Sequence, residues 1–208
     1  MKNIYLFIAG LLLISCSKEK THGPWNLKDG QEVEVLVSHR YGATDDNLTL
    51  TPQNKTAEGS IHNFTDREAG YNYRIKARMA APAEPPQDGP SYWLEFVKVL
   101  SKEKYAGNDP FVIELVQGSM AGPFILLRKE NNQYQFIVGN ITLNPATPAV
   151  ATKLAEIWEY WEQAINPAGD VAPRPEVKWR SIKARVTHDP SAFGKAYLVS
   201  DIDLVLKN

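Results

Sequence analysis

The sequence predicts a mainly β protein of the α+β class, built from two small antiparallel β units, the second of which carries one helix. Apolar and polar residues alternate over many short runs, a pattern typical of half-buried strands. Only the stretch at about 147–166 places its apolar residues on one helical face. We expect a signal peptide at 1–15, a tether at 16–30, an N-terminal β domain at 31–106 and a C-terminal β domain at 107–208.

In the N-terminal domain the clearest strand is 71–79, where apolar residues alternate with Asn72, Arg74, Lys76 and Arg78. Further strands are expected at 31–41, 48–50, 60–64 and 92–100, with a polar loop at 52–59. In the run 92–100 the apolar residues change face after Phe96, which predicts a bulge or burial on both faces. Residues 80–90 contain four prolines and predict an ordered loop.

In the C-terminal domain, strands are expected at 111–116, 124–127, 133–138, 179–188 and 195–206. Thr147 and Pro148 have the residue types of a helix N-cap and first helical position. The apolar stripe of this helix includes Trp158 and Trp161, which we expect in the core, and leaves Tyr160 off it. The resulting order, β-β-β-α-β-β, is shared by the OB-fold barrel and by α+β sandwiches, so an OB-like barrel is one alternative.

The N-terminus has the features of a secretory signal. Lys2 precedes an uncharged, mostly apolar run of 11 residues, Ile4–Ile14, which is too short for a spanning helix of about 20 residues. The run ends in Leu13-Ile14-Ser15-Cys16, which resembles the bacterial lipobox. That resemblance implies cleavage before Cys16, a diacylglycerol on its thiol, palmitate-type acylation and an outer-membrane lipoprotein facing the periplasm or the cell surface.

Composition excludes several other classes. Lys and Arg number 23 against 24 Asp and Glu, so the net charge of −1 gives no reason to expect a nucleic-acid partner. A single Cys excludes an internal disulfide framework and any site with several Cys ligands. Gly118-Ser119-Met120-Ala121-Gly122 has the spacing of a nucleophile elbow but precedes an expected strand, not a helix. We therefore expect no cofactor, no metal and no catalytic residue.

One run of the first domain resembles a known family. Gly70 to Ile75, then Pro85-Pro86-Gln87-Asp88-Gly89, then the strand from Tyr92 to Lys102 form a Gly-x-x-Tyr strand, a Pro-Pro-x-Asp loop and a strand closing on Ser-Lys. This pattern resembles a domain of unknown function found in bacterial envelope lipoproteins, over about residues 31–104. The resemblance implies a structural hairpin and no active-site residue.

Two features of the folded domains are candidates for function. His188 and Asp189, where a strand enters a turn, have the residue types of a general base and its partner, or simply of a turn. The second set consists of rings, basic residues and a loop carboxylate that suit a glycan or an acidic ligand; its members are Tyr92, Trp93, Asp88, Arg74 and Arg78.

The working hypothesis from the sequence is a lipid-anchored, non-catalytic binding or scaffolding module of a bacterial envelope, with the membrane as one partner and an envelope protein or glycan as another. Two alternatives stay open. One is an envelope hydrolase that uses His188 and Asp189. The other is an assembly or inhibitor protein that binds another envelope protein along an open sheet edge.

Overall fold

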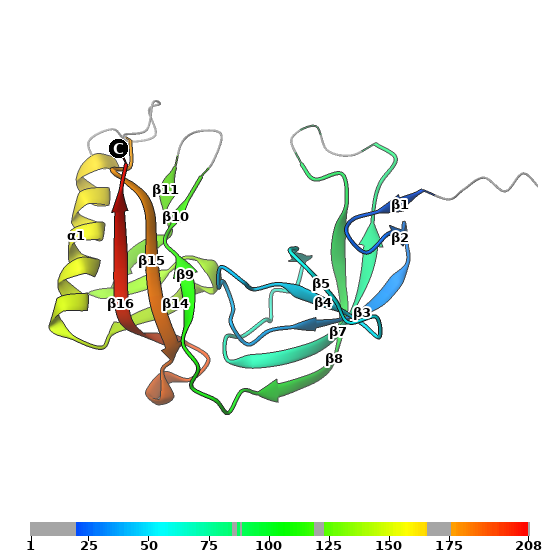
Figure 1. Cartoon of the computed structure of the whole chain (residues 1–208), viewed down its shortest axis with the longest axis horizontal. Coiled ribbons are helices and arrows are strands. Elements are labelled where there is room, and N and C mark those ends of the chain that lie inside the picture. The colour runs from blue at the N-terminus through cyan, green and yellow to red at the C-terminus, as the bar shows by residue number, and fades with distance from the viewer. Residues whose placement is uncertain (1–19, 85–86, 88, 119–122, 166–175, 208) are drawn as a thin grey trace, which may run out of the picture.

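The computed structural model describes residues 20–84, 87, 89–118, 123–165 and 176–207. It is mainly β, as the sequence predicts. The described residues form two units side by side, each built on a six-stranded sheet, and one long helix covers the second sheet (Figure 1). The first sheet ends at Lys104 and the second begins at Phe111. No helix among the described residues is long and apolar enough to cross a membrane.

The first sheet has the strand order β5-β4-β3-β7-β8-β6. Its strands are β3 (Glu32–Val37), β4 (Leu48–Thr51), β5 (Lys55–Ala57), β6 (Ile61–His62), β7 (Tyr71–Ala80) and β8 (Trp93–Lys104). Strand β5 lies in the stretch that the sequence predicts as a loop, where Lys55–Ala57 pairs with Leu48–Leu50. Alternation holds along β7, whose odd-numbered residues from Tyr73 to Met79 are buried. The even-numbered residues therefore form a solvated outer face.

The predicted bulge in β8 is confirmed. Ala77 pairs with Phe96 and Lys76 with Lys98, so Val97 has no partner in β7, and a second shift leaves Leu100 without one. Each shift inserts one extra residue into β8. Leu94, which precedes both shifts, faces the core beside Met79 in β7, whereas the residues from Val97 to Lys104 are exposed.

The predicted tether at 16–30 is wrong in its second half. From Thr21 the chain forms a short ladder between β1 (Thr21–His22) and β2 (Leu27–Lys28). Trp25 and Leu27 are buried in the core of the first sheet. This ladder has two residues in each strand, so no periodicity marks it in the sequence, and the burial of the two side chains holds it in place.

The second sheet has the order β12-β13-β14-β16-β15-β9. Its strands are β9 (Phe111–Glu114), β12 (Leu127–Glu130), β13 (Gln133–Phe136), β14 (Ile141–Pro145), β15 (Trp179–His188) and β16 (Ala196–Leu206), with a small ladder of β10 (Val116–Gln117) and β11 (Phe124–Ile125) beside it. Strand β14 is an addition to the predicted β-β-β-α-β-β order. It pairs in parallel with β16, on the far side of the helix in the sequence. The sheet has six strands where the OB-fold has five.

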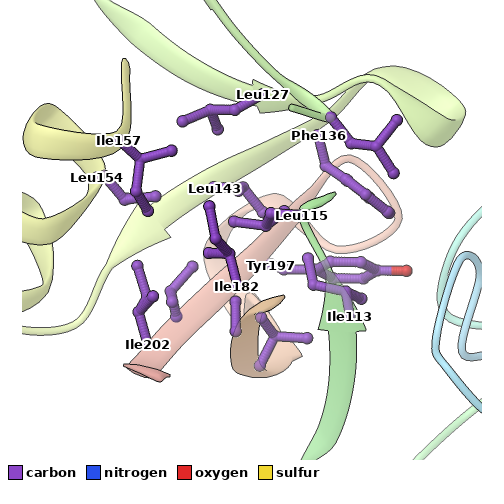
Figure 2. Close-up of a cluster of buried hydrophobic side chains, with 14 of the residues drawn as sticks. Ile113, Leu115, Leu127, Phe136, Leu143, Leu154, Ile157, Ile182, Tyr197 and Ile202 are labelled. Carbon is purple, nitrogen blue, oxygen red and sulfur yellow. The ribbon is translucent and has the colours of Figure 1, made fainter. Parts of the chain in front are cut away.

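Helix α1 (Pro148–Ile165) begins as predicted, with Thr147 Oγ1 accepting a hydrogen bond from the Val150 amide over 3.3 Å. Leu154 and Ile157 are fully buried, and Figure 2 shows them pointing into the cluster that also holds Ile182 and Ile202. Trp158 and Trp161 pack against this core but are only partly buried.

Tyr160 differs from expectation, because it also packs against the core of the second unit. Its ring meets Trp179 edge to face at 4.9 Å, and its hydroxyl donates to the Glu176 carbonyl over 2.8 Å. The apolar face of the helix is therefore wider than the sequence stripe suggests.

The two units are joined by backbone and side-chain contacts. Ala43 forms an isolated antiparallel bridge with Ile113, and the Thr44 amide donates to the Val112 carbonyl over 2.8 Å. Tyr197 is fully buried in the second core, and its hydroxyl points toward the first unit (Figure 2), where it donates to the Tyr41 carbonyl over 2.8 Å. The junction is therefore packed and hydrogen-bonded.

Candidate functional site

A pocket of about 400 Å³ lies at the end of the first sheet. Ligand pockets in proteins span about 300–1,000 Å³, so its size is sufficient for a small ligand. Four segments build it: the β1–β2 turn, the stretch leading into β6, Met79 near the end of β7, and the start of β8. Its lining combines four aromatic rings, four further apolar side chains and a polar rim. Its members include Trp25, His62, Tyr92, Trp93, Pro24, Met79, Pro90, Leu94, Glu58, Ser60 and Ser91.

Trp25 forms a fixed wall of this pocket. It is 8% exposed, and its indole Nε1 donates to the Lys55 carbonyl of β5 over 2.9 Å. Gly23 in the same turn has a positive φ of 69°, and a Cβ there would lie 3.1 Å from the Tyr92 ring. Glycine therefore both allows the turn and leaves room for the tyrosine.

Trp93 is held from two sides. The parallel pairing of β6 with β8 brings His62 beside it, and the two rings stack with centroids 5.4 Å apart at 18°. The indole Nε1 donates to a Glu95 carboxylate oxygen over 2.9 Å. Hydrogen bonds from Asn63 and then Trp93 lower the pKa of Glu95, so the carboxylate that orients the indole is ionised at neutral pH.

Tyr92 is the open ring of the pocket, 39% exposed and 6.4 Å from the ring of His22. Among the described residues its hydroxyl has no hydrogen-bond partner. An amphipathic ring with a free polar tip is a common feature of binding surfaces. Tyr92 and Trp93, both predicted from the sequence, thus lie in one pocket, whereas Trp25 and His62 join them through contacts that the sequence does not reveal.

The basic residues predicted for the ligand site lie elsewhere, on the outer face of the first sheet. Arg74 forms an ion pair with Glu34, and Arg78 with Glu32, both across the β3–β7 ladder. Hydrogen bonds from Arg78 and then Lys76 lower the pKa of Glu32. Arg74 lines two hollows of about 570 and 510 Å³ on this face. Glu32 and Glu34, which alternate along β3, thus hold these basic residues in ion pairs, a signal already visible in the sequence.

His188 and Asp189 do not act as a pair in this structure. Asp189 accepts hydrogen bonds from the Ser191 amide at 2.8 Å and hydroxyl at 2.6 Å, and from Asn144 at 2.7 Å, and these bonds lower its pKa. The His188 ring faces away, with Nε2 bonded to another histidine and Nδ1 without a partner among the described residues. Asp189 caps the short 3-10 helix at Pro190–Ala192, so it has the role in a turn that the sequence offered as the alternative to a catalytic role.

The partner of His188 is His39, which sequence reasoning missed. His39 Nδ1 and His188 Nε2 lie 2.8 Å apart across the junction of the two units, and Tyr105 stacks on His39 at 3.6 Å. Burial lowers the pKa of both histidines to about 4, and Arg40 adds to the effect at His39. His188 is 4% exposed. The pair therefore joins the units as neutral imidazoles, with His188 buried and His39 partly exposed.

Several sequence predictions lie wholly or partly outside the described residues. They are the signal peptide at 1–15, the lipid site Cys16, the ordered loop at 80–90 with its carboxylate Asp88, and the Gly118–Gly122 segment, of which Gly118 alone is described. Among the described residues, no group of three or more His, Cys, Asp or Glu side chains is placed to hold a metal ion.

The edge of β8 beyond its short pairing with β6 is one strand edge to which the assembly hypothesis can apply. Strand β6 pairs only with Leu94 and Glu95, and Val97, Val99 and Leu100 further along are each 36–41% exposed. The two bulges twist this edge and three lysines follow in the same stretch, features by which natural proteins discourage strand addition.

Comparisons with known proteins identify no relative of this chain. No family model, no curated protein and no solved structure matches the chain. The candidate site therefore depends on its own geometry alone.

Proposed function

We propose that this chain is a lipid-anchored, non-catalytic binding protein of a bacterial envelope, held in the outer membrane through Cys16. The support for the anchor comes from the sequence. A basic residue, an apolar run of 11 residues and a Leu-Ile-Ser-Cys tetrad stand in the order that lipoprotein signals have. Acyl chains contribute about 0.8 kcal/mol for each buried CH₂, so two or three chains hold a protein stably in a membrane.

The single observation that carries the binding role is the aromatic pocket. Trp25 and Trp93 are oriented by hydrogen bonds to Lys55 and Glu95, while Tyr92 is open to solvent beside them. A pocket whose walls are fixed before binding loses little conformational entropy when a ligand enters. Pre-formed apolar walls with a few polar groups are the general form of small-ligand sites.

The geometry gives less support to the hydrolase alternative. Its two residues have different hydrogen-bond partners, and His188 is buried between the units. A general base must reach the proton that it abstracts, within about 3 Å or through one water.

Replacing Cys16→Ser tests the anchor. We expect the variant to accumulate as a precursor that incorporates no labelled palmitate, whereas the parent chain is labelled and found with the membranes. Serine has a hydroxyl where the lipid attachment needs a nucleophilic thiol, so the loss should be complete. The control is Ser17→Ala, next to the same site, which should be labelled like the parent. Palmitate on the Cys16→Ser chain would show that the anchor is wrongly placed.

A further inference from the structure

We infer that the aromatic pocket binds a sugar ring of an envelope glycan, in an arrangement where one face of the pyranose packs on Tyr92 and its hydroxyl groups meet the polar rim. This inference depends on the proposed binding function, because it names the ligand class of the same pocket. Three properties of the site support it: the open ring, the chemistry of the rim, and the rigidity of the walls.

The open ring suits a ligand with a flat apolar face. Tyr92 is 39% exposed at the mouth, and Trp25 and Met79 form the buried wall behind it. One face of a pyranose carries mainly C–H groups, and such a face gains dispersion and electrostatic energy on an aromatic surface. A tyrosine also offers its hydroxyl to the ligand, and this hydroxyl has no partner among the described residues.

The rim suits a neutral ligand with many hydroxyl groups. Glu58 contributes a carboxylate that accepts hydrogen bonds, and Ser60 and Ser91 contribute hydroxyls that donate and accept. No lysine or arginine is among the described residues that line the pocket, so a phosphate or an acidic ligand would lack a counter-charge. A wholly apolar ligand would remove the Glu58 carboxylate from water without a hydrogen bond in return.

The walls are held in place before any ligand enters. The indole nitrogens of Trp25 and Trp93 already have acceptors, and His62 covers one face of Trp93. Sugars bind proteins through many weak contacts. A site that orders few side chains on binding loses little conformational entropy, so more of the contact energy remains as binding free energy. The pocket volume of about 400 Å³ is large enough for one sugar ring. The rest of the glycan chain would then extend into solvent.

The test uses the full lipid-anchored chain in detergent and ligand-observed saturation-transfer NMR. The probes are N,N′,N″-triacetylchitotriose, maltotriose and, as a non-sugar cation for an aromatic pocket, choline. We expect saturation transfer to at least one of the two sugars, strongest at the protons of one ring face. Tyr92→Ala should weaken that binding about tenfold or more, whereas Tyr92→Phe, which keeps the ring, should retain most of it.

Each outcome has one meaning. Sugar binding that falls in Tyr92→Ala and persists in Tyr92→Phe supports the inference, provided that both variants have the circular dichroism spectrum of the parent. Choline binding that requires Tyr92 while neither sugar binds would overturn the sugar and leave the pocket as a binding site. If no probe binds, or if sugar binding is unchanged in Tyr92→Ala, the sugar assignment to this pocket is wrong.

Discussion

Replacing Trp179→Ala should lower the free energy of unfolding by about 3–5 kcal/mol, the loss typical of removing a buried large aromatic side chain. Trp179 is 1% exposed at the start of β15, where Tyr160 packs against its ring at 4.9 Å and Lys178 lies over its face at 4.3 Å. The substitution removes the ring that joins the helix to the sheet and leaves a cavity that the surrounding strands fill only in part.

Urea unfolding followed by circular dichroism measures this loss, and Trp158→Ala provides the matched control. Trp158 packs on the same core from α1 but is only partly buried, so less apolar surface returns to water when it is truncated. We expect a clearly smaller loss for Trp158→Ala than for Trp179→Ala. Equal losses, or a loss below about 1 kcal/mol for Trp179→Ala, would show that the core is packed differently.

The histidine pair at the junction should make the protein less stable in acid. The folded chain keeps both imidazoles neutral down to a pKa of about 4, whereas in the unfolded chain they titrate near the ordinary value of 6.5. Between these values the unfolded chain binds protons that the folded chain does not. The contribution of this pair to stability is therefore complete above about pH 6.5, falls as the pH drops through this window and is lost below about pH 4.

The expected loss from this pair is on the order of 2 kcal/mol, after allowance for the partial solvent screening of His39. Urea unfolding midpoints between pH 7.5 and 4 measure it. His188→Phe suits the surrounding rings of Phe111, Phe193 and Tyr197 and should flatten the profile. His62→Gln, which removes a histidine outside the junction, should keep the parent slope. If His188→Phe kept the pH dependence of the parent, the histidine pair would be excluded as the source of the acid sensitivity.

Much of the strand framework follows from local sequence patterns, because the period-two alternation of a half-buried strand is written along the chain itself. Strand β7 and the bulge in β8 are clear cases. The short strand β14 was missed, since Ile141–Pro145 has only five residues, ends in a proline and follows a turn. Its identity comes from parallel pairing with β16, some fifty residues later, which no local pattern encodes.

The residues of the candidate site likewise fall into those that the local sequence reveals and those that only the fold brings together. Tyr92 and Trp93 attract attention as adjacent rings at the end of a proline-rich loop. Trp25 lies in the stretch that the sequence predicts as a tether, because a ladder with two residues in each strand has no periodic signal. His39 and His188 are 149 residues apart and meet only where the two units pack. By contrast, the pairing of Arg74 and Arg78 with glutamates of β3 could have been anticipated from the alternation of Glu32 and Glu34.

Photo-crosslinking from the pocket in living cells tests the binding role most directly. A benzoylphenylalanine in place of Tyr92, in the lipid-anchored chain, should form a light-dependent adduct with an envelope component, which mass spectrometry can assign to glycan or protein. The same group in place of Lys98, exposed on β8 outside the pocket lining, is the control. We expect an adduct at position 92 that is absent at position 98. No adduct at position 92, or identical adducts at both positions, would contradict the aromatic pocket as the binding site.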